Sequence, residues 1–203
     1  MWAADRGHAW RQRGRAAKQR GGAAVEFALL VGLFLTIVFG ILEVARVIYL
    51  FNTLQEVTRR AAALAVNSPF DPTSQGTVQS EALFPDKNGN LVLGAPVTPA
   101  HVQVQYLSLS YGAGGVPNMQ VVNPLPADPA RNRLNCQSNP YAANCIRLVR
   151  VRICRPGSGT GCDPVPYQML FPLVDFSTLT LPISETLAPA QTLGYVPGDL
   201  PGT

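Results

Sequence analysis

The sequence predicts an α+β protein, in which a long N-terminal helix packs on a small antiparallel β-sheet. Two observations lead to this prediction. Residues 27–42 form an uncharged apolar run, which continues into a segment with helical periodicity up to residue 66. Beyond residue 69 this periodicity ends, and segments of alternating apolar and polar residues follow, separated by turns rich in glycine and proline. Alternation with a period of two is typical of strands that are buried on one face.

The first 21 residues form a basic segment. It contains six arginine and lysine residues and a single aspartate, whereas the whole chain has a net charge of +4. A basic segment before an apolar run indicates a cytoplasmic N-terminus, because arginine and lysine are costly to move across a membrane. Nucleic-acid binding is the other interpretation of a basic segment. We favour the topological one and predict no nucleic-acid partner.

The apolar run predicts a membrane-spanning helix. Within residues 27–42 the single polar side chain is Thr36, but a spanning helix needs roughly 20 residues. A longer span, residues 25–51, suffices if it accommodates Glu43 and Arg46. These two residues lie on one helical face, where they can pair. They form either an ion pair at the membrane interface, with Arg46 reaching toward the headgroups, or a polar contact to a neighbouring subunit.

The helix is expected to continue beyond the membrane, to about residue 66. Its apolar side chains recur at spacings of three and four residues, at Leu50, Leu54, Val57, Ala61 and Leu64. Such a stripe needs an apolar surface to cover, which is either the chain's own outer domain or the helix of a neighbour. Pro69 ends the helix, because proline disfavours the helical conformation at the residue before it.

The outer domain, residues 67–187, is predicted to contain the antiparallel sheet. Residues 101–111 and 146–154 alternate and predict two strands, the second with a change of register near its middle. Residues 167–171 and 177–181 are shorter candidates. A sheet with one apolar face would cover the outer half of the helix in a two-layer arrangement. The final residues, 188–203, are rich in proline and glycine and predict a flexible tail.

Four cysteines lie in the outer domain and predict two disulfides. Four cysteines allow three pairings, and an oxidising compartment favours bond formation. We favour the pairs Cys136–Cys145 and Cys154–Cys162, each closing a short loop beside the strand at residues 146–154, while crossed pairings remain open. The spacing contains no Cys-x-x-Cys and no histidine is near in sequence, so neither a metal site nor a cofactor is predicted.

No catalytic residues are predicted. The two histidines, His8 and His101, fall on opposite sides of the predicted membrane and so cannot share a site. The acidic residues of the outer domain show no paired spacing, and the sequence has neither a phosphate-binding loop nor a dinucleotide-binding fingerprint. The chain is therefore predicted not to be an enzyme.

A motif at the start of the helix carries the sharpest signal. It consists of Gly21, Gly22, Glu26 and Phe27. A carboxylate here can be an acidic residue at a helix N-terminus, which the helix dipole favours. The order of glycine, four residues, glutamate and aromatic also resembles the prepilin-peptidase site of type IV pilins and pseudopilins. The resemblance implies cleavage after Gly21, which makes Glu26 the fifth residue of the mature chain; cleavage after Gly22 would make it the fourth.

A longer segment, about residues 20–66, is similar to the TadE-like family, which are minor pilins or pseudopilins of the tight-adherence (Flp/Tad) pilus. The similarity rests on the sequences GAAVEFALL, GILEVAR and LQEVTRRAAALAV. These contain Glu26, the pair Glu43 and Arg46, and a closing Arg-Ala-Ala. The chain departs from the family in having Val-Gly at residues 31–32, where members often have a proline. The later sequence TLTLPIS is loosely similar to the ends of TadE-like and TadG-like ectodomains.

The resemblance implies a minor pilin or pseudopilin that takes part in assembling a Tad/Flp-type pilus or a related secretion or adhesion filament. Implied partners are other pilin subunits, bound through the N-terminal helix, a prepilin peptidase and the inner-membrane assembly platform. Glu26 is implied to pair with the N-terminal amine of an adjacent subunit, because a buried carboxylate is costly without a partner. The implied location is the bacterial inner membrane, with the outer domain in the periplasm or outside the cell.

The predicted organisation therefore has four parts. They are a basic cytoplasmic leader at residues 1–21, the helix at residues 22–66, the disulfide-bearing domain at residues 67–187 and the tail at residues 188–203. The alternative function is that of an unprocessed single-pass membrane protein whose outer domain binds an extracytoplasmic partner. An intact basic leader in the mature protein is the feature that distinguishes this alternative.

Overall fold

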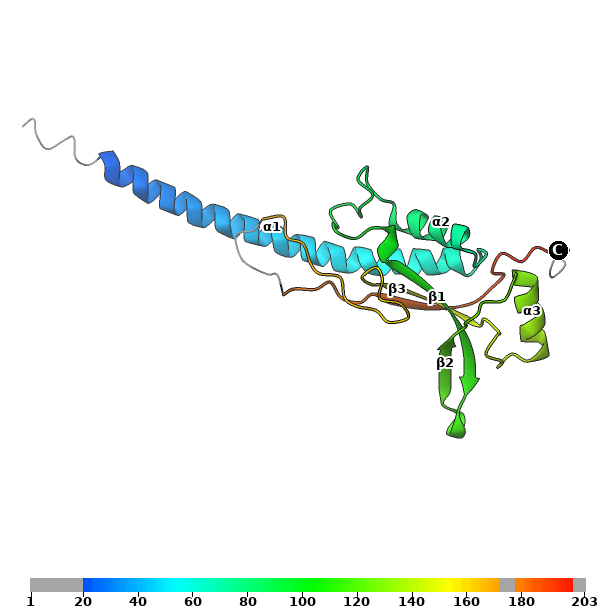
Figure 1. Cartoon of the computed structure of the whole chain (residues 1–203). Coiled ribbons are helices and arrows are strands. Elements are labelled where there is room, and N and C mark those ends of the chain that lie inside the picture. The colour runs from blue at the N-terminus through cyan, green and yellow to red at the C-terminus, as the bar shows by residue number, and fades with distance from the viewer. Residues whose placement is uncertain (1–19, 172–177, 199–203) are drawn as a thin grey trace, which may run out of the picture. The chain divides into compact units, whose positions relative to one another are not determined.

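The computed structural model describes residues 20–171 and 178–198, so most of the predicted leader lies outside the described residues. The chain forms two compact units, Met1–Val44 and Ala45–Thr203. Helix α1 (Arg20–Ala65) makes up the described part of the first unit and continues into the second (Figure 1). The long N-terminal helix that the sequence predicts is confirmed, and it ends one residue earlier than expected.

The second unit is built on a four-stranded antiparallel sheet. Its strand order is β2-β1-β3-β4, so that β1 and β3 are central and β2 and β4 are the edges. The strands are β2 (Pro117–Val121), β1 (Val102–Tyr111), β3 (Leu148–Ile153) and β4 (Glu185–Pro189). Both central strands lie within segments whose alternation predicts a strand. The predicted α+β class and the antiparallel sheet are therefore confirmed.

Two short helices lie where no helix was predicted, α2 (Pro72–Leu83) and α3 (Pro129–Ser138). Each begins with an Asp-Pro pair. The carboxylate of Asp71 accepts two hydrogen bonds of 3.0 Å from backbone N–H groups of the first turn of α2. Asp128 accepts one of 2.6 Å from the N–H of Arg131 in α3. Aspartate as N-cap and proline as the first helical residue both suit the unpartnered N–H groups at a helix start.

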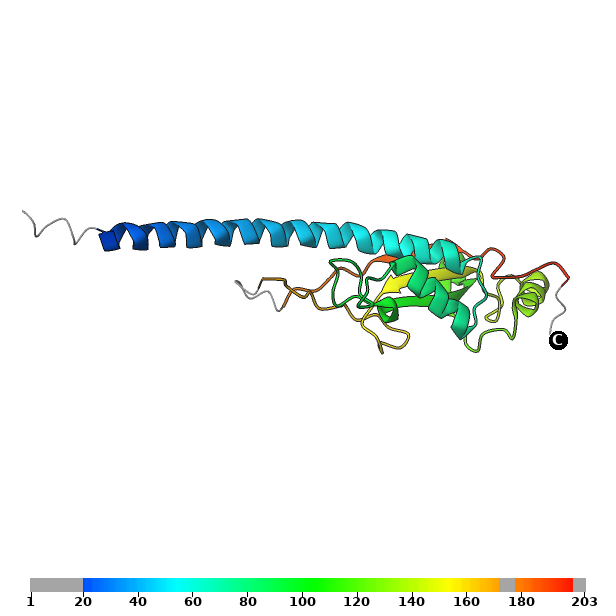
Figure 2. The ribbon, with the colours of Figure 1, turned by 90° about the horizontal axis from the view of Figure 1, so that it is seen from above.

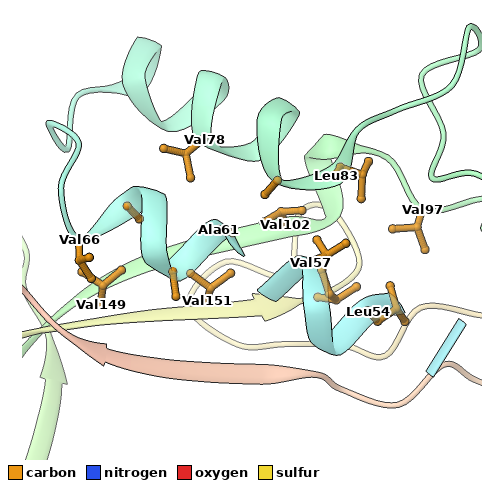
Figure 3. Packing of buried hydrophobic residues seen from close by; sticks show 14 of the residues in the cluster. Leu54, Val57, Ala61, Val66, Val78, Leu83, Val97, Val102, Val149 and Val151 are labelled. Atoms are coloured by element: carbon orange, nitrogen blue, oxygen red, sulfur yellow. The ribbon is translucent and has the colours of Figure 1, made fainter. Parts of the chain in front are cut away.

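The core of the second unit lies between the outer half of α1, helix α2 and one face of the sheet (Figure 3). From α1, Leu50, Leu54 and Ala61 are each 0% exposed, and Leu64 is partly buried. The remaining core residues include Val78 and Leu83 from α2, and Val102, Val149 and Val151 from the strands. The apolar stripe of α1 therefore covers the chain's own outer domain, which is one of the two surfaces that the sequence left open.

Strand β3 differs from the prediction in its register. Val149, Val151 and Ile153 are buried in strict alternation with less buried neighbours. The predicted change of register within this strand is therefore wrong. The sequence suggests such a change because Ile146 and Leu148 are apolar and out of step with Val149, Val151 and Ile153. Ile146 is indeed buried, but it lies before the first residue of β3.

The C-terminal segments also differ from the prediction. Where two further short strands were expected, the described residues show a single β-bridge between Pro166 and Thr180. Strand β4 pairs with β3 and extends to Pro189, two residues into the predicted tail. Leu193, further along, is only 2% exposed. The chain thus remains packed beyond residue 188, while residues 199–203 lie outside the described part.

Two disulfides close loops on either side of β3. Cys136 in α3 is bonded to Cys145, with a Cα–Cα distance of 4.9 Å. Cys154 follows β3 and is bonded to Cys162, with a Cα–Cα distance of 5.0 Å. These are the pairs that the sequence favoured, and all four cysteines are used.

Candidate functional site

The first unit presents an exposed apolar helix. From residue 22 onward most side chains of α1 in this unit are exposed. Large examples are Phe27 at 69%, Leu29 at 70%, Phe34 at 63% and Ile41 at 64%. Among the described residues, α1 is the one helix that is long and apolar enough to cross a membrane. This helix fits a single-pass membrane anchor.

The predicted processing and assembly residues lie in the first turns of α1. Gly21 and Gly22 fall within its first turn, and Glu26 and Phe27 follow in the next. A Cβ atom built onto Gly22 would meet no atom within 4 Å, so the backbone there is uncrowded. The Glu26 side chain is exposed, and Glu26 is the single charged residue among residues 22–42. An isolated carboxylate in an apolar setting needs a cationic partner or a proton.

Arg46 lies in the second unit, and its side chain is 7% exposed. Its Nε donates a hydrogen bond of 2.8 Å to the carbonyl oxygen of Leu93. Its Nη1 donates one of 2.6 Å to the carbonyl oxygen of Gln168 and one of 3.0 Å to the hydroxyl oxygen of Tyr167. Its Nη2 reaches the carbonyl oxygen of Ala95 at 3.4 Å. The guanidinium thus fastens two loops of the outer domain to α1.

The ring of Tyr167 adds a second kind of contact. The guanidinium carbon of Arg46 lies 5.1 Å from the centre of this ring, within the range of a cation–π interaction. The planar guanidinium suits this combination, because it can donate in several directions within its plane while its face rests on an aromatic ring. A lysine could not reproduce both contacts.

Sequence reasoning missed these contacts of Arg46. It singled out the residue for its position three residues after Glu43, a spacing that α1 provides and that allows the two to pair. The hydrogen-bond partners, however, are 47 and 122 positions later in the chain. No local pattern marks Leu93 or Gln168, because both accept through backbone carbonyl groups that every residue has. The described residues contain no group of three or more histidine, cysteine, aspartate and glutamate side chains that could hold a metal ion.

The long apolar helix and the disulfide-bearing α+β domain together fit a protein held by a single-pass membrane anchor. Residues 21–63 match the model of the TadE-like protein family. The matched segment contains Glu26, Glu43 and Arg46, so the resemblance that the motifs indicate is confirmed. No curated protein and no solved structure matches the chain.

The family match and the apolar helix fit a membrane protein that is associated with a Tad pilus. The match also suggests an interaction with a pilus assembly system. The TadE-like family is structural rather than catalytic. The match ends at residue 63, so the loose similarity of the later sequence to TadE-like ectodomains stays a prediction.

Proposed function

We propose that this protein is a minor pilin or pseudopilin-like subunit that takes part in assembling a Tad/Flp-type pilus or a related secretion or adhesion filament. The observation that carries the proposal is the TadE-like match over residues 21–63, on a helix in which Glu26 is the one carboxylate of residues 22–42. In this proposal the bilayer surrounds the exposed apolar side chains before assembly. Helices of neighbouring subunits surround them afterwards.

Processing precedes assembly in this proposal. The basic leader stays on the cytoplasmic side of the inner membrane, where a prepilin peptidase cuts after Gly21. The new chain then begins at Gly22 and has a free α-amine one helical turn before Glu26. The outer domain lies in the periplasm or outside the cell, a compartment that favours its two disulfides. Partners are other pilin subunits, the peptidase and the assembly platform.

Glu26 sets the register between subunits in this proposal. A carboxylate among apolar helices is costly unless it is paired. The α-amine of an adjacent subunit supplies the opposite charge, and the attraction is strong where water is excluded. A shift of one subunit along the other separates the two charges and leaves both unpaired. The pair therefore favours one axial offset over all others.

N-terminal sequencing of the mature protein tests the processing step. In cells that contain the prepilin peptidase, the mature chain is expected to begin at Gly22, and in cells without it the leader is expected to remain. Gly21→Leu should block the cut. The matched control is Gly32→Leu, which changes a glycine of the same helix where an added Cβ meets no atom within 4 Å. A mature chain with an intact leader in peptidase-containing cells contradicts the proposal and favours the membrane-anchored binding protein.

Incorporation of the subunit into sheared pili tests the role of Glu26. Glu26→Ala is expected to lower incorporation strongly while the protein is still made and inserted. Glu56→Ala is the matched control, because this carboxylate lies on the same helix and forms an exposed ion pair with Arg60 at 2.9 Å. Exposed pairs of this kind contribute about 0.3–0.5 kcal/mol. Equal incorporation of the Glu26 variant and the wild type would show that the register role is wrong.

A further inference from the structure

One turn of the outer domain carries large apolar side chains where polar ones are usual. The N–H of Gly94 donates to the carbonyl oxygen of Leu91 at 2.7 Å, which closes a turn over residues 91–94. The two residues at its tip are Val92, which is 49% exposed, and Leu93, which is 61% exposed. Turn tips ordinarily hold glycine, asparagine, aspartate, serine or proline.

The backbone of this turn makes the choice of residues more unusual. Leu93 has a φ of 55°, the left-handed conformation that glycine and asparagine adopt with least strain. The turn is held firmly, since Leu91 is 4% exposed and a Cβ on Gly94 would come within 2.7 Å of the Leu91 side chain. The second unit therefore keeps two aliphatic side chains at a fixed, outward-facing tip in spite of the strain.

A second loop that also binds Arg46 presents apolar side chains. Leu170 is 55% exposed and Phe171 is 36% exposed. They follow Gln168, whose carbonyl oxygen binds the Arg46 guanidinium at 2.6 Å, and the same guanidinium binds Leu93 at 2.8 Å. One side chain therefore holds both loops, and Val92, Leu93, Leu170 and Phe171 form what we call the apolar rim.

The position of Arg46 in the chain indicates what covers the apolar rim. A membrane span of roughly 20 residues that begins near residue 25 ends near residue 44. Arg46 comes two residues later, at the level where a spanning helix meets the lipid headgroups and where arginine and aromatic side chains are common. The two loops whose carbonyl oxygens this residue binds are therefore expected at the depth of the bilayer surface.

We propose that the apolar rim is a membrane-docking surface, in which Val92, Leu93, Leu170 and Phe171 enter the interfacial layer of the outer leaflet around α1. The occupant is phospholipid, with aliphatic and aromatic side chains among the upper acyl chains. The rim gives the outer domain a second attachment besides α1 and holds it against the bilayer before assembly. The inference rests on the membrane-anchor part of the proposed function and adds an attachment that this function does not require.

Tryptophan fluorescence of the full chain in phosphatidylcholine nanodiscs tests the docking. Trp2 and Trp10 are first changed to phenylalanine, and one tryptophan is then introduced as Val92→Trp. Val92 has no left-handed φ, so the larger side chain does not conflict with the backbone there. Lipids brominated near the glycerol end of their acyl chains are expected to quench the fluorescence of this tryptophan. They should quench a tryptophan introduced as Phe171→Trp to a similar extent.

Two control variants make the result decisive. Val116→Trp replaces an exposed valine, at 63%, in the turn between β1 and β2, outside the rim, and should not be quenched. Phe34→Trp lies in the predicted span and should be quenched by lipids brominated deeper in the chain. Quenching at position 34 without quenching at 92 overturns the docking and leaves the anchor standing. Absence of quenching at 34 overturns both, and equal quenching at 92 and 116 overturns the docking as non-specific adsorption.

A second pair of measurements guards against a folding artefact and a different occupant. Leu93→Asn suits the left-handed backbone, so the melting temperature should stay the same or rise, while quenching of the tryptophan at 92 should fall. A photoreactive side chain at position 93 should form adducts with phospholipid. If it instead forms adducts with a second copy of the chain, the rim is a subunit contact and the proposal is wrong.

Discussion

Arg46 is the residue on which the junction between α1 and the outer domain depends. Four of its hydrogen bonds and a cation–π contact involve loops that lie far from it in the sequence. Hydrogen bonds to a buried charged group are worth more than neutral ones, about 1.5–3 kcal/mol each by mutation. The residue that the motif singled out for assembly therefore also stabilises the fold of a single chain.

Arg46→Lys is expected to lower the free energy of unfolding of the outer domain by about 1–3 kcal/mol. Lysine keeps the charge but lacks the several N–H donors in one plane that bind both loops. The measurement is thermal unfolding of the full chain in detergent, followed by near-ultraviolet circular dichroism. Arg59→Lys is the control, since Arg59 is exposed on the same helix. Equal melting temperatures for the two variants would contradict the role of Arg46.

His101 gives the outer domain a dependence on pH. Partial burial lowers the pKa of the His101 imidazole below its usual value of 6.5. Its Nδ1 accepts a hydrogen bond of 3.0 Å from the N–H of Thr98. A backbone hydrogen bond with Thr98 raises the pKa and offsets part of the effect of burial, which is the larger of the two. As the pH falls through the usual pKa, the unfolded chain binds a proton that the folded chain does not. The free energy of unfolding should therefore be highest above that pH and fall below it.

Melting temperatures of the full chain in detergent, measured from about pH 7.5 to about pH 5.5, check this expectation. The wild type should melt at progressively lower temperature as the pH decreases. His101→Asn should flatten the dependence, because asparagine can accept the Thr98 hydrogen bond but does not titrate. An unchanged slope in this variant would assign the dependence to other groups.

At the scale of elements, α1 joins a membrane-type surface to a core-type surface within one helix. Its first part is exposed and apolar, and its outer half buries one stripe against α2 and the sheet, as Figure 3 shows. This buried stripe on the outer half is narrow, because the remaining faces of the helix carry polar side chains such as Gln55 and Glu56. The contribution of each half can therefore be measured separately.

Leu54→Ala is expected to lower the free energy of unfolding by about 2–5 kcal/mol, since it removes a fully buried side chain and leaves a cavity. Leu187→Ala is the matched control, because Leu187 lies in β4 with 43% of its surface exposed. Surface changes of this kind usually stay within about 0.5 kcal/mol. Chemical denaturation of the full chain in detergent measures the free energy of unfolding of both variants. Equal destabilisation by the two would show that α1 is not part of the core.

The elements differed in how well the sequence predicted them, and the reasons are physical. The sequences of β1 and β3 alternate over six or more residues, which marks both as strands. In β3 the burial follows this alternation, whereas in β1 the four successive residues 105–108 are all buried. Helices α2 and α3 bury few side chains, and their signal is confined to the Asp-Pro start. Edge strand β4 has the sequence ETLAP, which contains a proline and no β-branched residue except threonine. Its identity depends on pairing with β3, which no local pattern reveals.

At the scale of the whole molecule, the apolar side chains of the two units differ in their surroundings. In the described part of the first unit most of them are exposed, and in the second unit they pack into a core. The buried residues of the core cluster all come from residues 50–193, within the second unit. The ribbon of α1 runs through both units (Figures 1 and 2). The exposed apolar side chains of α1 in the first unit contribute nothing to that core cluster. The second unit therefore has what an independent domain needs, namely its own core and two disulfides.

A chain of residues 45–203 is expected to fold without the first unit when it is made in an oxidising compartment. It should contain both disulfides and unfold cooperatively, because its core and the contacts of Arg46 are intact. Size-exclusion chromatography, peptide mapping without reduction and circular dichroism check this. The full chain should be recovered with membranes in the same cells. Scrambled disulfides or the absence of a cooperative transition would contradict the independence of this unit.

The sequence by itself determined the long helix, its membrane-type half, the α+β class and the family of residues 21–63. These features depend on composition, on periodicity and on short motifs, which are local properties of the chain. The tertiary structure alone decided which surface the stripe of α1 covers, where the edge strands lie and what Arg46 binds. These depend on backbone groups and on residues as far as 122 and 128 positions apart, and backbone carbonyl groups carry no sequence signature. The same physical reason explains why the apolar rim around Arg46 emerges only when the chain is folded.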